Sequence, residues 1–320
     1  GHHNEDYDCF GAAMGVACMA RAIGKPVHIV LSDTNEGIDR ILDMVGKDEA
    51  YDGLFVRAGD IAGVASLTAL LVVVDAHIPH ILADPTLLER IPKIVVIDHH
   101  RRSENFVKNP LLVYIETASS SASELVTELL MYFGDKVRPT RLDATALYSG
   151  VVVDTKNFNV GAGVRTFDAA AYLRRAGADP VLVRALFQSD YETTVALARA
   201  KANAEYFAGG LIVGSIPERL ANGQIIAAQA ADGMLRVDGV RMSIYVFQLP
   251  GDAVGISARS TGELNVQVIM EAFGGGGHAN VAGAQVKGVP LSVVRGNVVE
   301  RAREYIEESD KHESHTAGGR

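Results

Sequence analysis

The sequence predicts an α/β protein in which a doubly wound parallel sheet is followed by a smaller domain with a mixed sheet. Residues 27–31, 70–74 and 94–97 are short runs of almost only apolar, largely β-branched side chains. Strands of a parallel sheet have this composition because helices cover both of their faces. Residues 10–23 and 121–133 have helical spacing, and an alternation of strands and helices is typical of a doubly wound sheet.

The second half of the chain has a different pattern. Residues 179–206 have helical spacing throughout. Strand-like runs then follow at residues 211–216, 224–229, 242–248 and 254–258, and a helix at 265–273. The predicted division is a first domain at 1–187, a helical connector at 188–208, a second domain at 209–308, and a disordered, polar and glycine-rich tail at 309–320.

The composition favours a globular protein that binds a small ligand. The chain has 320 residues, of which 48% are hydrophobic and 22% charged, enough for two domains. No apolar run approaches the roughly 18 residues of a membrane-spanning helix, and no signal peptide is predicted. The net charge is −9 without a dense run of Lys and Arg, which argues against duplex nucleic acid and favours a small nucleotide. Cys9 and Cys18 would lie about 13 Å apart on one helix, too far for a disulfide, so reduced thiols are predicted.

Acidic and histidine residues that can bind a metal ion occur at four separate places in the chain. The N-terminus has the pattern His-x-x-x-Asp-x-Asp, and the other three places follow predicted strands, the last of them at residues 151–153. The residues are His2, Asp6 and Asp8, then Asp75, then Asp98, His99 and His100, and finally Asp154. The carboxyl ends of parallel strands share one edge of a sheet, so these side chains can converge.

Each of these residues also has an ordinary explanation when it is taken singly. His2 and His3 could be the remnant of a purification tag, and an aspartate after a strand, such as Asp75 or Asp154, is often a turn or helix cap. Capping does not explain four such places in one parallel sheet. The set as a whole therefore predicts a metal site.

The order of these motifs resembles the DHH phosphoesterase superfamily with its DHH-associated C-terminal domain. The resemblance runs from Gly1 to about Ile306 and includes a glycine run followed by His278. Four segments resemble the GdpP-type branch, the cyclic-di-AMP phosphodiesterases: residues 97–102, 123–130, 153–158 and 265–271. The membrane helices, PAS-like module and degenerate cyclase-like module of that branch have no counterpart in this sequence, and residues 57–66 match no feature of it. The first motif begins at residue 2, where a strand should precede it, so we expect a fragment of a longer protein.

The resemblance implies two divalent metal ions. His2, Asp6 and Asp75 would hold one ion, and the other ligands are Asp8, Asp75, His99 and Asp154, with Asp75 bridging. Four carboxylates would balance two divalent charges, whereas without ions their mutual repulsion would raise their pKa values. Oxygen and imidazole ligands without thiolate favour Mn²⁺ over a structural Zn²⁺ site, although Zn²⁺ and Co²⁺ stay open. Asp98 would orient a ligand imidazole from outside the ligand set.

The activity that the resemblance implies is hydrolysis of cyclic di-AMP to linear 5′-pApA by a metal-activated hydroxide. His100 would face the substrate phosphate and assist the leaving alkoxide, and its alternative role is plain packing. The nanoRNase and pAp-phosphatase branch, which acts on short linear RNA and 3′,5′-bisphosphonucleotides, is the second enzyme candidate. A family II pyrophosphatase lacks the glycine-run motif, and a nucleotide sensor with a decayed metal site is disfavoured because all six expected ligands are present.

The second domain is expected to bind the nucleotide. Glycines let backbone amides approach a phosphate or base closely, although a glycine run alone is usually a flexible loop. The residues that match the motif are Arg259, Ser260, Gly274, Gly275, Gly276, Gly277, His278 and Asn280. Gly11 and Gly15 in the first helix are expected to allow close helix packing instead. The resemblance further implies a homodimer and the cytoplasmic catalytic domain of a membrane-anchored bacterial protein.

Overall fold

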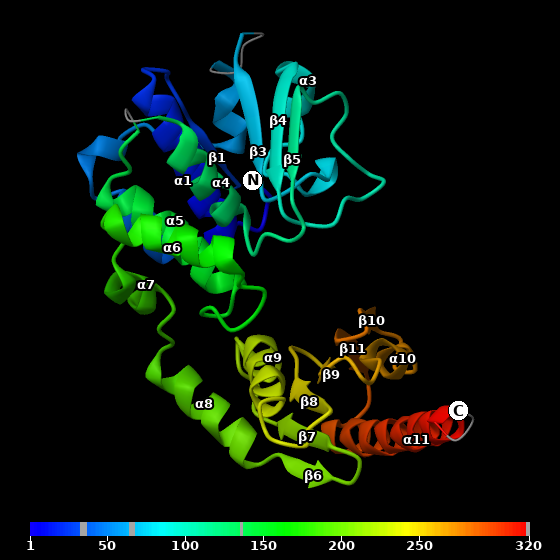
Figure 1. Cartoon of the computed structure of the whole chain (residues 1–320). Coiled ribbons are helices and arrows are strands. Elements are labelled where there is room, and N and C mark those ends of the chain that lie inside the picture. Colours follow the sequence, from blue (N-terminus) through cyan, green and yellow to red (C-terminus); the bar gives the residue numbers. More distant parts are fainter. Residues whose placement is uncertain (33–36, 64–67, 135–136, 318–320) are drawn as a thin grey trace. The chain divides into compact units, whose positions relative to one another are not determined.

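The structure is a computed structural model that describes residues 1–32, 37–63, 68–134 and 137–317. The chain divides into two compact units, Gly1–Gln188 and Ser189–Arg320, and each is described here by itself (Figure 1). Within the described residues, no helix combines the length and the apolar composition that crossing a membrane requires.

The first unit is built on parallel strands. One pair joins β1 (Ile29–Leu31) to β2 (Phe55–Arg57). A three-stranded sheet has the order β3 (Leu70–Val74), β4 (Lys93–Asp98), β5 (Leu112–Ile115). All of these pairs are parallel, which confirms the predicted class for this unit.

Three helices cross closely beside this sheet: α1 (Tyr7–Ala22), α4 (Ala122–Tyr132) and α5 (Arg141–Asp154). Glycines allow the close approach. A Cβ added at Gly11 would lie 2.5 Å from the carbonyl oxygen of Ala146 in α5, and one at Gly150 would lie 2.8 Å from Cα of Asp8. A Cβ at Gly15 would likewise meet a side chain of α4 at 2.5 Å. The glycines of α1 therefore serve packing, as expected.

The prediction of a strand at residues 151–153 was wrong, because these valines form the last turn of helix α5. Thr140 and Asp143 make a capping box that starts this helix, and fully buried residues recur along it with helical spacing, as at Leu147 and Val151. The sequence analysis also did not resolve several other elements of this unit: η1 (Glu49–Tyr51), η2 (Ala58–Gly63), η3 (Pro79–Ile81), α2 (Asp39–Val45), α3 (Leu87–Arg90) and α6 (Val164–Arg175). Helix α7 (Pro180–Leu186) lies within the predicted helical stretch at residues 179–206.

The second unit contains a mixed sheet, as predicted, and this sheet has six strands. Its strands are β6 (Glu205–Phe207), β7 (Leu211–Ile216), β8 (Met242–Gln248), β9 (Ala253–Ser260), β10 (Gly276–Gly277) and β11 (Val281–Lys287), in the order β10-β11-β9-β8-β7-β6. Strands β7 and β8 are parallel, and the other pairs are antiparallel.

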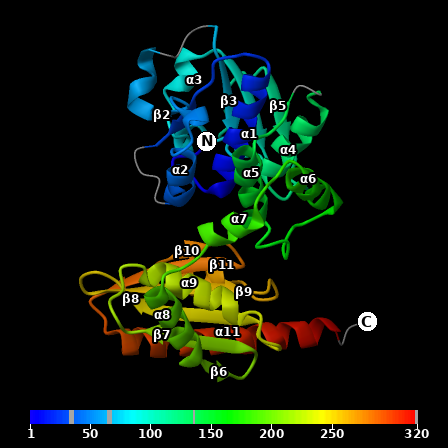
Figure 2. The ribbon, with the colours of Figure 1, turned by 90° about the vertical axis from the view of Figure 1, so that its left-hand side faces the viewer.

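Helices cover both faces of this sheet (Figure 2). On one face, α10 (Val266–Glu271) and α11 (Leu291–Ala317) pack in the largest buried cluster of the unit. On the other face, α8 (Tyr191–Ala202) and α9 (Gly223–Met234) pack against the aromatic rings of Tyr245 and Phe247 in β8.

Three details of the second half differ from the prediction. The helix predicted across residues 179–206 is interrupted: α7 ends at Leu186, and the side chain of Asp190 caps the new helix α8, which packs against α9. Residues 224–229, which were expected to form a strand, belong to helix α9 instead. Ile226 and Ala230 are both fully buried, and a spacing of four residues places them on the same face of a helix. Helix α11 continues to Ala317 through the expected tail, since glycine first returns at residue 318, and Asp310 of this helix pairs with Arg241 at 2.9 Å.

Candidate metal centre

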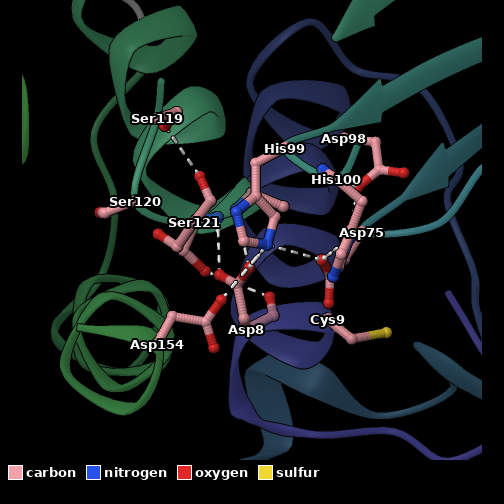
Figure 3. Close-up of polar contacts among 12 residues, drawn as sticks. Asp8, Cys9, Asp75, Asp98, His99, His100, Ser119, Ser120, Ser121 and Asp154 are labelled. Atoms are coloured by element: carbon pink, nitrogen blue, oxygen red, sulfur yellow. Dashed lines mark hydrogen bonds and ion pairs between the residues drawn. The ribbon is translucent and has the colours of Figure 1, made fainter. Parts of the chain in front are cut away.

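Histidine and aspartate side chains from distant segments meet in the first unit (Figure 3). His99 lies between three carboxylates: its Nε2 is 3.3 Å from Asp154 Oδ2, 3.5 Å from Asp75 Oδ1 and 3.8 Å from Asp8 Oδ2. His2 faces the other oxygen of Asp75, with Nε2 3.3 Å from Oδ2. The carboxylate of Asp75 therefore has one oxygen toward each imidazole, the arrangement of a group that can bridge two cations.

The sheet places Asp75, Asp98 and His99 at the carboxyl ends of β3 and β4. Asp75 follows β3 with a φ of 55°, a left-handed conformation that aspartate tolerates better than most residues. Its backbone N–H donates to Ile97 of β4 at 2.9 Å, which brings it beside Asp98, the last residue of that strand, and thus beside His99. Asp154 arrives from the C-terminus of helix α5 instead of from a strand. That helix end is electrostatically unfavourable for a carboxylate, so a nearby positive charge is needed to stabilise it.

The N-terminal motif is folded around the start of helix α1. One oxygen of Asp6 caps the helix by accepting from the backbone N–H groups of Asp8 and Cys9 at 3.0 and 2.9 Å. The second oxygen of Asp6 lies 3.8 Å from Nε2 of His2. Asp8 is completely buried, and its two oxygens accept from the first backbone N–H groups of α4, those of Ala122 and Ser123, at 2.7 and 2.8 Å. The positive end of α4 thus fixes the carboxylate of Asp8.

The closely spaced carboxylates of the site shift the pKa values of its members. Burial, followed by the charges of Asp75 and Asp154, raises the pKa of Asp8 well above its usual value. Burial would lower the pKa of His99, but its interactions with Asp154 and Asp75 outweigh this and raise it to about 11. When no ion is bound, His99 would therefore be protonated at neutral pH.

The donor set fits divalent metal ions. Among the described residues, Asp75 Oδ1 and His99 Nε2 are buried without a hydrogen-bond partner. The two atoms lie at ion-pair distance from each other but lack hydrogen-bond geometry, which suits ligands directed at a common cation. Potential ligand atoms form three groups, and within each group all atoms lie within 4.8 Å of one another. The groups are His2, Cys9 and Asp75; Asp75, His99 and His100; and Asp8, His99 and Asp154.

Sequence reasoning missed two residues beside this centre. The thiol of Cys9 is close to His2 and Asp75, but burial raises its pKa to about 12, so it stays protonated at neutral pH. His77 was not singled out at all, and the only signal for it is its position two residues after Asp75. It is 2% exposed and holds Asp98.

Asp98 contacts a different histidine from the one expected. Its Oδ1 accepts from His100, from the backbone N–H at 3.1 Å and from Nδ1 at 2.8 Å. Burial would raise the pKa of Asp98, but hydrogen bonds from His100 and His77 lower it to about 2. Asp98 thus orients His100, which is not one of the six predicted ligands, whereas the expectation concerned a ligand imidazole.

In the second unit, most of the predicted nucleotide-binding residues gather at a hairpin. Strand β10 pairs with β11, and His278 closes the turn, its N–H donating to Val281 at 2.7 Å. Ser260 joins the turn from β9, donating from its N–H to the carbonyl of Asn280 at 3.0 Å. Arg259 instead pairs with Asp232 of α9, with Nε 3.2 Å from Oδ1, because neighbouring residues of a strand point to opposite faces.

The four glycines of the run differ in their surroundings. A Cβ at Gly275 would lie 2.1 Å from the carbonyl oxygen of Gly283 in β11, and one at Gly277 would lie 2.5 Å from that of Val281. Gly274 has a φ of +72°. A Cβ at Gly276 would meet none of the described residues within 4 Å. Gly275 and Gly277 thus serve the hairpin itself, whereas Gly276 leaves its backbone open to a ligand.

Two family models match this chain, one in each of its two compact units. Residues 1–151 match the DHH family, N-terminal domain, and residues 209–309 match the DHHA1 domain. The chain belongs to the DHH family and carries a DHHA1 domain.

Two curated proteins are similar to this chain over most of its length. The chain is 39% identical over 312 residues to cyclic-di-AMP phosphodiesterase GdpP of Bacillus subtilis, covering 96% of this chain and 47% of that protein. It is 41% identical over 296 residues to cyclic-di-AMP phosphodiesterase PdeA of Listeria monocytogenes, covering 91% and 45%. The chain thus spans about half the length of these curated relatives.

Two more distant proteins extend the comparison. The bifunctional oligoribonuclease and PAP phosphatase NrnA of Thermus thermophilus is 26% identical, covering 95% of this chain and 88% of that protein. The crystal structure of an exopolyphosphatase-related protein from Bacteroides fragilis superposes with a TM-score of 0.71 at 17% identity, covering 96% of this chain and 90% of that one. The latter likeness concerns the fold alone.

Proposed function

We propose that this chain is the catalytic portion of a cyclic-di-AMP phosphodiesterase that produces linear 5′-pApA. The observation that supports the proposal is a cluster of six histidine and aspartate side chains. Each of them has a nitrogen or oxygen atom within 3.8 Å of such an atom in at least one other member of the cluster. They come from four separate places in a chain that is 39% and 41% identical to two proteins named as cyclic-di-AMP phosphodiesterases.

The six side chains would hold two divalent ions, which we propose to be Mn²⁺. His2, Asp6 and one oxygen of Asp75 would form one half of the centre. Its other half comprises Asp8, the second oxygen of Asp75, His99 and Asp154. When bound, the ions would supply an activated water and stabilise charge on the phosphoryl oxygens. Oxygen and imidazole donors suit Mn²⁺, and the thiol of Cys9 stays protonated at neutral pH.

His100 would donate the proton to the leaving group. Its Nδ1 is engaged in the hydrogen bond to Asp98, and the side chain is 58% exposed, so Nε2 would be the nitrogen that serves a substrate. The same hydrogen bond raises the pKa of His100 above its usual value, which favours the protonated ring that a general acid requires. In the reaction, Nε2 would protonate the 3′ oxygen as its bond to phosphorus breaks, leaving a 5′-phosphate and a free 3′ hydroxyl.

The hairpin of the second unit would bind the nucleotide. The open backbone at Gly276, together with His278, Asn280 and Ser260 around the same turn, offers hydrogen-bond donors and acceptors to a base or phosphate. For the whole protein, the resemblance implies a homodimer and membrane attachment on the cytoplasmic side. Light scattering of this chain tests the first, and fractionation of cells that express the full-length protein tests the second.

A comparison of substrates tests the proposed function. Purified protein with Mn²⁺ is incubated separately with cyclic di-AMP, pApA and pAp, and products are followed by chromatography. We expect the highest kcat/KM for cyclic di-AMP, with pApA as the product. Faster turnover of pApA or pAp would instead favour the nanoRNase and pAp-phosphatase activity, the second candidate because NrnA of Thermus thermophilus aligns with 95% of this chain.

A further inference from the structure

His77 lies at the centre of a buried network behind the proposed catalytic residues. It is 2% exposed and Asp98 is completely buried. The Nδ1 of His77 lies 2.5 Å from Oδ2 of Asp98, and the Nε2 accepts a hydrogen bond from the backbone N–H of Ser103 at 3.0 Å. Both ring nitrogens are therefore occupied by protein atoms, and His77 is not one of the six proposed ligands.

These contacts fix the tautomer of His77. A backbone N–H can only donate, so Nε2 must carry the lone pair and Nδ1 the hydrogen. That hydrogen is donated to Oδ2 of Asp98, while Oδ1 of the same carboxylate accepts from Nδ1 of His100 at 2.8 Å. The carboxylate of Asp98 is thus held from one side by His77 and holds His100 on the other.

Further contacts fix the ring of His77 itself. It stacks on Phe106 with ring centroids 5.3 Å apart, and the guanidinium of Arg102 lies 4.4 Å from the centroid of Phe106. The backbone carbonyl of His77 accepts from Val107 at 2.9 Å. The loop after His100 is therefore attached to the same histidine that holds Asp98.

We propose that His77 is a positioning residue for the phosphodiester reaction, which sets the orientation of His100 through the carboxylate of Asp98. Without the Nδ1 hydrogen bond, the Asp98 carboxylate can rotate about its side chain, and His100 loses its fixed direction toward the leaving oxygen. This inference rests on the proposed function. Residues that orient a catalytic group in this way typically change activity by about 10- to 100-fold when they are replaced.

Two substitutions of nearly equal shape isolate the hydrogen bond. His77→Leu removes both ring nitrogens, whereas His77→Asn keeps an N–H close to the position of Nδ1. Both remove the stacking on Phe106, so a difference between them reports the contact with Asp98. His80→Ala is the matched control, because His80 is exposed and contacts Asn105 of the same loop without reaching Asp98.

We expect His77→Leu to lower kcat on cyclic di-AMP by about 10- to 100-fold, with KM and metal content close to those of the unaltered protein. His77→Asn should recover most of this loss, and His80→Ala should leave kcat unchanged. The inference is overturned if the Leu and Asn variants have equal kcat, or if the loss lies in KM or in metal content. His77→Phe, which keeps the stacked ring but not the nitrogens, replaces His77→Leu if the latter does not fold.

A second measurement separates this inference from the proposed function. In the Mg²⁺-loaded protein, the Nδ1–H protons of His77 and His100 should each give a downfield resonance in imidazole ¹H–¹⁵N spectra, because both are bonded to the carboxylate of Asp98. The His100 resonance is identified as the one missing from His100→Gln, and it should be lost or shifted in His77→Leu and kept in His77→Asn. A protein without activity on cyclic di-AMP would refute the proposed function, whereas an unchanged resonance in His77→Leu would refute the role of His77.

Discussion

The two polar centres of this protein are built from different materials. The centre of the first unit consists of ionisable side chains, brought from distant segments and partly buried, and its geometry depends on charge. The hairpin of the second unit is largely backbone: Gly275 and Gly277 pack against β11, and Gly276 leaves the chain open. The first should therefore respond to changes in charge, metal and pH, and the second to changes in shape.

Removal of metal should give the largest effect. Chelation with EDTA should reduce hydrolysis of cyclic di-AMP by on the order of 10³-fold or more. The fold should persist, because the helices and strands around the site have their own apolar core. Circular dichroism before and after chelation checks this. Mn²⁺ should restore the rate more fully than Mg²⁺, and global unfolding on chelation would show that the metals hold the fold.

Loss of a single proposed ligand should come next. Asp154→Ala removes one carboxylate from the cluster around His99, and kcat/KM should fall by at least about 10²-fold with the fold retained. The matched control is Asp168→Ala, which removes an exposed carboxylate from α6. Steady-state kinetics of both variants measure the loss of activity, and thermal unfolding checks that the fold is retained. A near-normal rate for Asp154→Ala would remove this residue from the ligand set.

The affinity for metal should depend on pH in a known direction. In the metal-free protein the pKa of His99 is raised to about 11, so its ring is protonated at neutral pH. A ligand imidazole must be neutral, so metal binding releases this proton, and affinity falls as pH falls below 11. We expect the Kd for Mn²⁺ to weaken about tenfold per pH unit for each proton released. Calorimetry in two buffers of different ionisation enthalpy counts the protons, and a buffer-independent heat would contradict the prediction.

The hairpin should give the smallest effect. Gly276→Val adds a side chain in open space where we propose the nucleotide lies, so KM for cyclic di-AMP should rise by about tenfold, equivalent to roughly 1.4 kcal/mol. Metal content and turnover of a small generic phosphodiester should change little. Gly275→Val is the contrasting variant: it collides with β11, so it should lower the thermal stability of the second unit as well. Equal loss on both substrates for Gly276→Val would mean that this glycine shapes the catalytic site itself.

Much of the first centre could be predicted because its residues follow apolar runs. Asp75 and Asp98 sit at strand ends as expected. The valines before Asp154 were taken for a strand because three β-branched residues favour one locally. The capping box that starts their helix lies farther back in the sequence, at Thr140 and Asp143. A short sequence pattern does not reveal where tertiary packing outweighs the local β propensity of the residues.

Other features depend on which way a side chain points, and one sequence does not reveal this. Arg259 and Ser260 are adjacent in a strand, yet they face opposite sides of the sheet, and only Ser260 joins the turn. His77 could not be inferred because its partners, Asp98 and Ser103, become neighbours only after the strands pair. The six proposed ligands and Asp98 were accessible to sequence reasoning, whereas His77, which holds Asp98, was not.

The crossing of α1, α4 and α5 has a consequence for genetics. Every missense change in a glycine codon adds at least a Cβ atom, and at Gly150 this atom would lie 2.3 Å from Ser123 Oγ and 2.8 Å from Oδ1 of Asp8. At Gly11 it would lie 2.7 Å from the same hydroxyl. A screen for loss of function should therefore recover alleles at these two glycine codons alongside those at the histidine and aspartate codons. Such alleles would displace Asp8 while leaving every proposed ligand codon intact.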